Sequence, residues 1–504
     1  TTASDSYGSS FLDALRVAGD FRFEAEPGYV SASRLEAAYL ERIRIHVHTR
    51  CRWPVGPLAP TVEFHCSPID PGGLGKDEIE CREGSGVDHM HVVVTSSLAV
   101  PPVSCSAPVA LVRPPEIVVG VGFSTDASRA EIELILRDVL RSSGISPLSV
   151  VAIATIDRKI GDLDDVDIDG HRPPAYYVPA ADLAEVEVPS PSEPVKRTVG
   201  VPSVAEASAI CVANMLGKDP ELVVSKVKTA RVTAAVARFD PKGVLGLVSL
   251  GPGSVGAVTP EAAEFLASAS HVLGYGPYVD MARPFCRRFA SLERYEIGSE
   301  QQRAEAAVRL ASEGRRVALV SGGDVGIYGM ASRALASELA SEIRNVDVVI
   351  IPGVSSLQAA AAALGAPLGD DFCCISLSDY GVGWPTIRKR LESAAEAGMV
   401  ICLFNPSSDR RPDATQQAAE VLLRHLPADT PVGIVWDAWR PGQRFEISSL
   451  GQLGSMSPGM SALVIVGNRN TKVIASRLVT YRQGEAVSVG GDPGSSVEIS
   501  TQKG

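Results

Sequence analysis

The stretch Val244-Leu-Gly-Leu-Val-Ser-Leu-Gly-Pro-Gly253 joins an apolar run to a glycine-proline turn. A short apolar run that ends in turn residues is typical of a buried strand. The same pattern recurs at Val317 to Asp324, Val346 to Ser356, Val400 to Ser408 and Val432 to Arg440, with helix-like segments between the copies. Strands that alternate with helices predict an α/β sheet. Open α/β folds bind their ligands beyond the carboxyl ends of such strands, so these turns are the first candidates for a site.

The composition places the chain among ordinary globular proteins. Its 504 residues suggest about three domains, at roughly 100–200 residues per domain. Apolar residues make up 45% and charged residues 21%, which excludes collagen-like, coiled-coil and mostly disordered chains. The net charge of −12 disfavours binding of nucleic acid or acidic membranes by the whole surface. No segment has the roughly 18–20 unbroken apolar residues of a membrane span. We therefore expect a cytoplasmic protein with neither nucleic-acid nor membrane partners.

The segment Gly251-Pro-Gly-Ser-Val-Gly256 matches the G-x-G-x-x-G pattern of dinucleotide-binding folds. That site also needs an acidic residue at the end of the second strand, to bind the ribose. The second strand here is His271 to Tyr275, which has no acid at its end. Pro252 also removes a backbone N–H that a pyrophosphate would use. An NAD-dependent oxidoreductase is therefore only a distant alternative.

Several strand-end motifs together resemble one family, the tetrapyrrole (class III) S-adenosylmethionine methyltransferases. Within it they look most like the precorrin-3B C-17-methyltransferases, and the similarity covers about residues 243–470. The motifs, in the order of the family, are Gly251-Pro-Gly253 with Val258-Thr-Pro260, Gly274 to Asp280, Ser321 to Met330, Pro352 to Ser356, Ile375 to Asp379 and Phe404 to Ser408.

The resemblance implies a two-lobed α/β methylase with S-adenosylmethionine folded between its lobes, and a homodimer. It also implies methylation at C-17 with ring contraction in corrin (vitamin B12) biosynthesis; a methylase of another corrin carbon is the alternative. The alternative is that these motifs are only tight turns of a doubly wound sheet. That would explain one such loop, but not five loops that follow one another in the same order as in the family. Carried over by position, the cofactor-binding residues are Gly251, Pro252, Gly253, Gly322, Gly323, Asp324, Ile327, Tyr328, Ser355, Ser356, Asn405 and Ala438.

The tetrapyrrole substrate that the resemblance implies carries many carboxylates, which guanidinium groups pair in bidentate fashion. Methyl transfer itself depends mainly on positioning. Asp379 follows a buried strand and is a candidate catalytic group for a proton, although a helix N-cap is the favoured role. A solvated face is the alternative for each single arginine. The candidate substrate-binding residues are Arg283, Arg287, Arg288, Arg410, Arg411 and Arg440.

The front half resembles a second family, the carboxyl-terminal domain of cobalt-precorrin-5A hydrolase, over about residues 115–239. The resemblance rests on Val118 to Gly122, Ala154 to Lys159, Pro189 to Glu193 and Val201 to Glu206. It implies opening of a lactone with release of acetaldehyde. Glu206 is the candidate catalytic residue and Lys159 the other polar position to test. A Ser203–Glu206 capping box and a surface ion pair are the structural alternatives. A tetrapyrrole-handover module without chemistry is the functional alternative.

These resemblances divide the chain into four parts. We expect a partial central domain of the hydrolase type at 1–112, its carboxyl-terminal domain at 113–240, the methylase at 241–483 and a flexible tail at 484–504. The stretch from Pro101 to Pro115 reads as a proline-rich linker. The chain begins at Thr1 inside what resembles a half-domain, so we expect the first domain to be incomplete.

Five of the eight histidines precede residue 92. His46 and His48, and likewise His89 and His91, alternate as they would on one face of a strand. With Cys66 they supply enough ligand types for zinc. No loop spacing supports a closed metal site, so a solvated strand face is the favoured interpretation and we expect no protein-bound metal.

Overall fold

The computed structural model describes residues 10–16, 18–19, 21–23, 29–50, 53–66, 89–98, 107–336, 339–379 and 381–482. They form two compact units, Thr1–Leu250 with Val258–Gly353, and Gly251–Ala257 with Val354–Gly504. The proposed tail at 484–504 and the first residues of the chain lie outside the described part. No single described helix is long and apolar enough to cross a membrane; one pair, bent by 73°, passes by length and composition only when its two helices are taken together.

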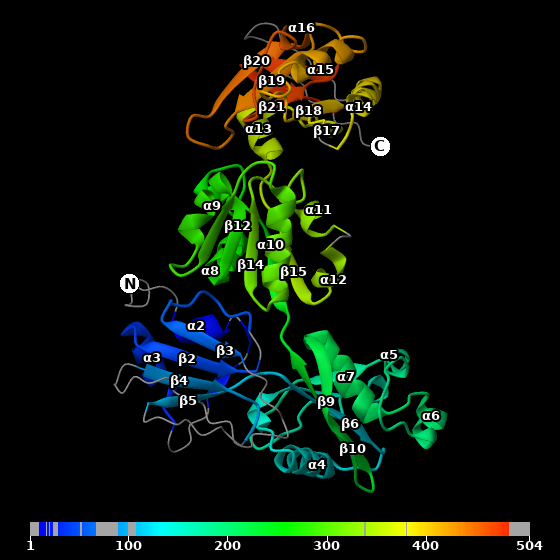
Figure 1. Cartoon of the computed structure of the whole chain (residues 1–504). Helices are drawn as coiled ribbons and strands as arrows, with labels where there is room; N and C mark the ends of the chain where they lie inside the picture. The colour runs from blue at the N-terminus through cyan, green and yellow to red at the C-terminus, as the bar shows by residue number, and fades with distance from the viewer. Residues whose placement is uncertain are drawn as a thin grey trace, which may run out of the picture. The chain divides into compact units, whose positions relative to one another are not determined.

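The first sheet of the larger unit has the strand order β1-β5-β4-β2-β3 (Figure 1). Two helices cover one face with an apolar core that includes Ile45, Val47 and Val92. The linker prediction is wrong for residues 109–113, because the apolar run between the prolines pairs with β4 as a strand. The elements are α2 (Phe11–Arg16), β1 (Arg22–Phe23), α3 (Ala32–Leu40), β2 (Arg44–Thr49), β3 (Val62–Cys66), β4 (His89–Val94) and β5 (Val109–Arg113).

The second sheet, in the order β8-β7-β6-β10-β9, has helices on both faces. Val119 and Val121 pack with α4, whereas Val118 lies in the core with α7. Gly120 allows the close approach of α7, since a Cβ there would clash with the Ala205 carbonyl oxygen. The elements are β6 (Ile117–Phe123), α4 (Arg129–Ser142), β7 (Val150–Ile156), β8 (Ala175–Val178), α5 (Ala180–Ala184), α6 (Glu193–Val199), α7 (Val204–Leu216), β9 (Lys218–Lys228) and β10 (Val232–Asp240).

The third sheet is wholly parallel, in the order β13-β12-β14-β11-β15. The strands that the sequence predicts here are confirmed, and their carboxyl ends meet at one edge of the sheet. The elements are β11 (Gly243–Ser249), α8 (Pro260–Ser268), β12 (His271–Tyr275), α9 (Gly276–Ala282), β13 (Ser291–Tyr295), α10 (Glu300–Ser312), β14 (Arg316–Ser321), α11 (Ala331–Ala334), α12 (Ala340–Ile343) and β15 (Val346–Ile351).

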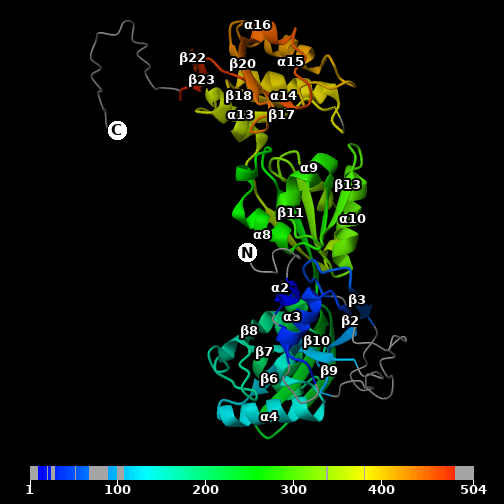
Figure 2. The same cartoon turned by 90° about the vertical axis from the view of Figure 1, so that its left-hand side faces the viewer.

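The carboxyl-terminal unit has a mixed sheet, β17-β18-β21-β19-β20, with α14 and α15 on one face and α13 on the other. Strands β17, β18 and β19 point the same way, because β18 and β19 are both antiparallel to β21. A small sheet, β16-β23-β22, lies beside α13 (Figure 2). The elements are α13 (Ser356–Leu364), β16 (Gly365–Ala366), β17 (Phe372–Ser376), α14 (Trp384–Glu396), β18 (Val400–Phe404), α15 (Ala414–Leu422), β19 (Pro431–Trp436), β20 (Arg444–Ser449), α16 (Leu450–Leu453), β21 (Ala462–Val466), β22 (Thr471–Ile474) and β23 (Arg477–Thr480).

Candidate functional site

Hydrogen bonds join the carboxyl end of β11 to the loops that follow β14 and β15 in the third sheet. The carboxylate of Asp324, after β14, accepts from the backbone N–H of Gly326 at 2.8 Å and from that of Gly353, after β15, at 3.0 Å. The hydroxyl of Ser249, at the end of β11, accepts from the N–H of Val325 at 2.8 Å. The carboxyl end of β11 and the loops after β14 and β15 are therefore held as one group at the edge of the sheet, where α/β folds bind ligands.

The loop after β14 combines tight glycine turns with exposed apolar side chains. Gly323 has φ +68°, and a Cβ on Gly322 would run into the ring of Tyr278. Ile327 and Tyr328 expose 42% and 55% of their surface, and Tyr328 has the unfavourable φ of +53°. Backbone strain of this kind persists where the surrounding structure enforces it, and it often marks binding sites. The loop thus offers an apolar surface on a fixed backbone.

Asp324→Ala should weaken binding of S-adenosylmethionine, the cofactor that the resemblance implies, about 10-fold or more, the equivalent of about 1.4 kcal/mol. The change removes both hydrogen bonds that tie the loop of Gly326 to that of Gly353, so the two loops lose their mutual alignment. Isothermal titration calorimetry measures the effect. Asp347→Ala, at an exposed position on β15 of the same sheet, is the matched control; equal affinities of the two variants would contradict this role of Asp324.

Several residues that follow the strands of the carboxyl-terminal sheet have a left-handed backbone conformation. Asn405 after β18 has φ +53°, and Asp437 and Trp439 after β19 have φ values of +49° and +58°. The side-chain amide of Asn405 donates to the hydroxyl of Ser376 at 3.0 Å, which links the ends of β17 and β18. Non-glycine residues adopt this conformation rarely, so three of them at one sheet edge indicate a functional surface.

The Gly251-Pro-Gly253 turn belongs to the same unit. Gly251 and Gly253 have φ values of +72° and +144°, which suit glycine. Arg440 donates from Nε to the Pro252 carbonyl at 2.6 Å, and a Cβ on Gly253 would clash with its side chain. Arg440, predicted to bind substrate, thus positions this turn. Ala438 is half-buried and packs against the apolar core beneath α13.

Ser355 and Ser356 lie at the start of α13. The Ser355 hydroxyl accepts from the N–H of Leu357 at 3.2 Å, and the Gln358 side chain accepts from the N–H of Ser355 at 2.8 Å. This reciprocal pair is a capping box, so the Ser355 side chain has a structural role. A cofactor-binding role for Ser355 and Ser356 stays a prediction.

Arg411 connects two strand-end loops. Its guanidinium donates to the carbonyls of Leu377 at 2.6 Å and Asn405 at 3.4 Å, and its Nε lies 3.5 Å from the Asp379 carboxylate. Asp379 is exposed. The N-cap predicted for Asp379 is wrong, because α14 begins at Trp384 and Gly383 occupies its N-cap position. A role for Asp379 in proton transfer stays a prediction.

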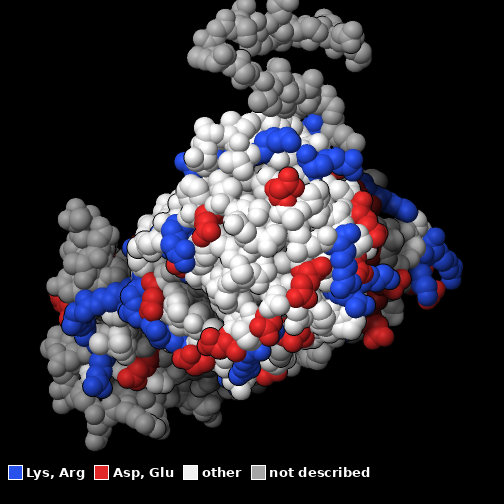
Figure 3. Space-filling model, turned by 90° about the horizontal axis from the view of Figure 1, so that it is seen from above, with Lys and Arg blue, Asp and Glu red and all other residues white. Residues whose placement is uncertain are grey.

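The other candidate substrate-binding arginines are solvent-exposed. Arg410 follows β18, and Arg283, Arg287 and Arg288 follow α9, with the Arg288 guanidinium 5.7 Å from the centre of the Phe289 ring. On the face drawn in Figure 3, basic and acidic side chains are interspersed around a broad uncharged area. The assignment of these arginines to substrate stays a prediction.

Glu206 is fully buried at the first turn of α7. The Ser203 hydroxyl accepts from the Glu206 N–H as predicted. The carboxylate does not return to the cap residue: its oxygens accept from the N–H groups of Ser190 and Lys226, at 3.2 and 3.1 Å. The predicted capping box is thus only half formed, because the buried carboxylate joins a loop and strand β9 to the helix. Catalysis by Glu206 stays a prediction.

Lys159 has the structural contacts expected of a surface pair. Its ammonium lies 4.7 Å from the centre of the Phe123 ring and 4.0 Å from the Asp162 carboxylate. An ammonium over an aromatic face gains electrostatic energy. Both contacts give Lys159 a structural role. They do not test a role in hydrolysis, which stays a prediction.

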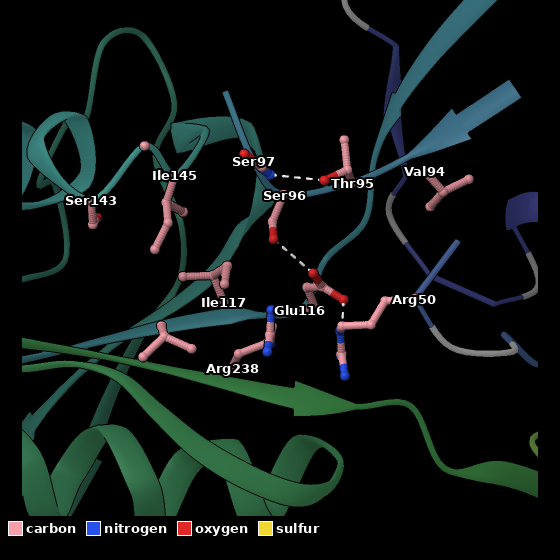
Figure 4. A pocket seen from close by; sticks show the side chains of 12 residues that line it. Arg50, Val94, Thr95, Ser96, Ser97, Glu116, Ile117, Ser143, Ile145 and Arg238 are labelled. Carbon is pink, nitrogen blue, oxygen red and sulfur yellow. Dashed lines mark hydrogen bonds and ion pairs between the residues drawn. The ribbon is translucent and has the colours of Figure 1, made fainter. Parts of the chain in front are cut away.

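Sequence reasoning missed a pocket, lined in part by charged side chains, between the first and second sheets (Figure 4). Glu116, fully buried, lies between Ser96, whose hydroxyl donates to it at 2.7 Å, and Arg50, at 3.3 Å. Arg238 lines the same pocket, and Arg50 also pairs with Asp240. Burial raises the pKa of Glu116, against the attraction of Arg50. The one local signal in the sequence is an acidic residue, Glu116, between Pro115 and an apolar run. The partners of Glu116 come from distant segments, so the sequence does not indicate them.

Comparison with known proteins agrees with both resemblances. Residues 244–454 match the family of tetrapyrrole (corrin/porphyrin) methylases, and residues 117–237 match the cobalamin synthesis G C-terminus. A precorrin-3B C(17)-methyltransferase of Sinorhizobium sp is 42% identical over 236 residues, which are 46% of this chain and 91% of the relative. The chain belongs to the tetrapyrrole methylase family.

Two further relatives resemble this tetrapyrrole methylase. A probable cobalt-factor III C(17)-methyltransferase of Salmonella typhimurium is 41% identical over 240 residues, 47% of this chain and 98% of the relative. The methyltransferase CobJ, whose crystal structure is known, is 35% identical in sequence. The two structures superpose over 47% of this chain and 99% of the CobJ chain, with a TM-score of 0.45. The predictions of an α/β methylase and of a hydrolase-like front region are confirmed. The matched range 244–454 contains every predicted cofactor-binding residue, and 117–237 contains Lys159 and Glu206.

Proposed function

We propose that this tetrapyrrole methylase transfers a methyl group from S-adenosylmethionine to C-17 of a precorrin-3-type tetrapyrrole, with contraction of the macrocycle. The identity of 42% across 91% of a precorrin-3B C(17)-methyltransferase carries the proposal. The sulfonium of the cofactor supplies an activated methyl group for an in-line displacement. The protein's contribution is chiefly to hold the two reactants in line, which lowers the barrier without an acid–base triad.

The residue types proposed for cofactor binding suit such a cofactor. Gly326 is exposed in the loop after β14, where its lack of a side chain lets a ligand approach the backbone, and Ile327 and Tyr328 offer apolar contact to a flat ring. Asn405 and Asp437 hold their loops in the left-handed conformation. These groups would bind and orient the cofactor and exclude water from its sulfonium, which strengthens electrostatic interactions there.

The position of the new methyl group tests the assignment. Purified chain with S-adenosylmethionine and a precorrin-3-type substrate should give a singly methylated, ring-contracted product. Mass spectrometry counts the methyl groups and NMR locates them, and we expect C-17. A methyl group on another carbon would instead show that the chain is a methylase of a different corrin position.

We propose a second activity for the front half, because residues 117–237 match the cobalamin synthesis G C-terminus. In this proposal it opens the lactone of a later corrin intermediate and releases acetaldehyde. Incubation of the intact chain with the lactone substrate should therefore release acetaldehyde, which a coupled dehydrogenase assay detects. Binding of the lactone without release would identify the front half as a handover module.

The finer properties of the enzyme are also part of the proposal. We propose domain limits at 112/113, 240/241 and 483/484, a homodimer, and a cytoplasmic location without nucleic-acid partners. Among the described residues, Cys211, Cys286, Cys373 and Cys402 form no disulfide, which supports a reducing compartment. Light scattering on the purified chain measures the oligomeric state.

A further inference from the structure

Five histidines come together on one face of the first sheet. His46 and His48 lie on β2, His65 on β3, and His89 and His91 on β4, and these three strands are parallel neighbours. In the register, His46 is opposite His91 and His48 is opposite His65. The other face of these strands packs in the apolar core, so alternation directs the imidazoles away from it.

The sequence-based interpretation of a solvated strand face is wrong for the inner part of this group. His91 is only 5% exposed, and its ring stacks on those of His46 and His48, with centroids 5.3 and 5.2 Å apart. Burial, followed by the neighbouring His91, lowers the pKa of His48 to about 4. The imidazoles contact one another because three strands that are separate in sequence lie side by side.

At the outer edge of the group, three ligand atoms converge. Nδ1 of His46 lies 3.1 Å from Nε2 of His65 and 3.5 Å from the carboxylate of Glu63, and the ligand atoms of all three residues lie within 4.8 Å of one another. Tetrahedral zinc with bonds of about 2.0–2.1 Å separates its ligand atoms by about 3.3–3.4 Å. The three side chains thus already lie close to metal-binding spacing.

A hydrogen bond from His46 to His89 would fix the tautomer that such a site needs. Its Nδ1 lies 3.1 Å from Nε2 of His46. If Nε2 of His46 carries the proton and donates to His89, Nδ1 of His46 presents its lone pair to His65 and Glu63. Metal-bound histidines commonly use their second nitrogen in this way. The opposite tautomers form a hydrogen-bonded His89–His46–His65 chain that needs no metal, so the two states are experimentally distinguishable.

We propose that His46, His65 and Glu63 bind one divalent transition-metal ion of the zinc type, with a fourth position open to water. Two imidazoles and a carboxylate form a donor set that proteins use for zinc with an open position. Glu63 and His65 are exposed, so the ion can enter from solvent. This site is independent of the methylase loops and departs from our expectation of no protein-bound metal.

Titration of untagged, metal-free full-length protein with Zn²⁺ by calorimetry tests the proposal. We expect one equivalent to bind, and Co²⁺ in its place should give the visible absorption of a four-coordinate nitrogen and oxygen site. His65→Gln should weaken zinc binding about 100-fold and Glu63→Gln about 10-fold, as loss of a ligand removes one metal bond. Because both residues are exposed, thermal unfolding of the metal-free variants should match that of the parent.

The matched control is His425→Gln, since His425 also lies near an acid, 3.6 Å from Glu396, but has no second imidazole in that pair. Its zinc affinity should equal that of the unchanged protein. The proposal is overturned if the unchanged protein binds zinc no more tightly than His65→Gln does. It is also overturned if His91→Gln abolishes binding while Glu63→Gln has no effect, because the ion would then lie on the His48–His91 pair.

Discussion

Gly323→Arg is expected to raise the dissociation constant of S-adenosylmethionine at least about 100-fold, the equivalent of about 2.7 kcal/mol. Gly323 is buried at the end of β14, and its neighbour Asp324 ties this loop to the loop after β15. Its φ of +68° means that any other residue at this position would have to adopt the left-handed backbone conformation. An arginine there meets both a strained backbone and a packed loop, at the centre of the proposed cofactor-binding edge. Calorimetry with the purified variant measures the loss.

Gly298→Arg separates loss of the site from loss of the fold. Gly298 lies in the same unit with φ +91°, and a Cβ there has no atom within 4 Å. Both variants place an arginine in the left-handed backbone conformation, which lowers the stability of the folded protein by about 1–2 kcal/mol. We expect Gly298→Arg to bind the cofactor normally. Normal binding by Gly323→Arg would exclude its loop from the site, and no binding by the unchanged protein would reject the methylase proposal.

The strand-end loops were predictable because their signal is local. An apolar run followed by glycine, proline or a small polar residue determines a strand and its turn within about ten residues. The predictions for Val244 to Leu250, Val317 to Val320 and Val432 to Trp436 therefore agree with β11, β14 and β19. The short strand β5 was missed because the prolines on both sides of it carry an equally local signal for a linker.

Contacts between distant segments were not predictable in the same way. The residue type of Arg411 or Arg440 shows that a guanidinium is present, but not that it binds backbone carbonyls of neighbouring loops. Glu116 meets Arg50 across 66 residues, and His46 meets His89 across 43. Such pairs depend on strand order and register, and a shift of one residue would turn the histidines to the other face. Only the structure supplies that register.

Glu206→Gln should lower the free energy of unfolding of the region around the second sheet by about 2–4 kcal/mol. A buried N–H left without an acceptor costs about 1–3 kcal/mol, and hydrogen bonds to a charged group are stronger than neutral ones. The carboxylate accepts from the N–H groups of Ser190 and Lys226 with separate oxygens. A glutamine presents an amide NH₂ to one of them, so two donors face each other. Urea unfolding measures the loss, and hydrogen exchange should quicken at both amides.

Glu131→Gln is the matched control, because Glu131 occupies the same third position of its helix. Its carboxylate closes an exposed capping box by accepting from the Ser128 N–H at 2.8 Å, a role that glutamine also fills. The unfolding midpoint of Glu131→Gln should therefore be unchanged. If Glu206→Gln were equally harmless but abolished acetaldehyde release, the structural role would be contradicted and Glu206 would act as a catalytic group. If stability and release fall together, the buried carboxylate supports the hydrolase-like domain by holding its loop and strand against α7.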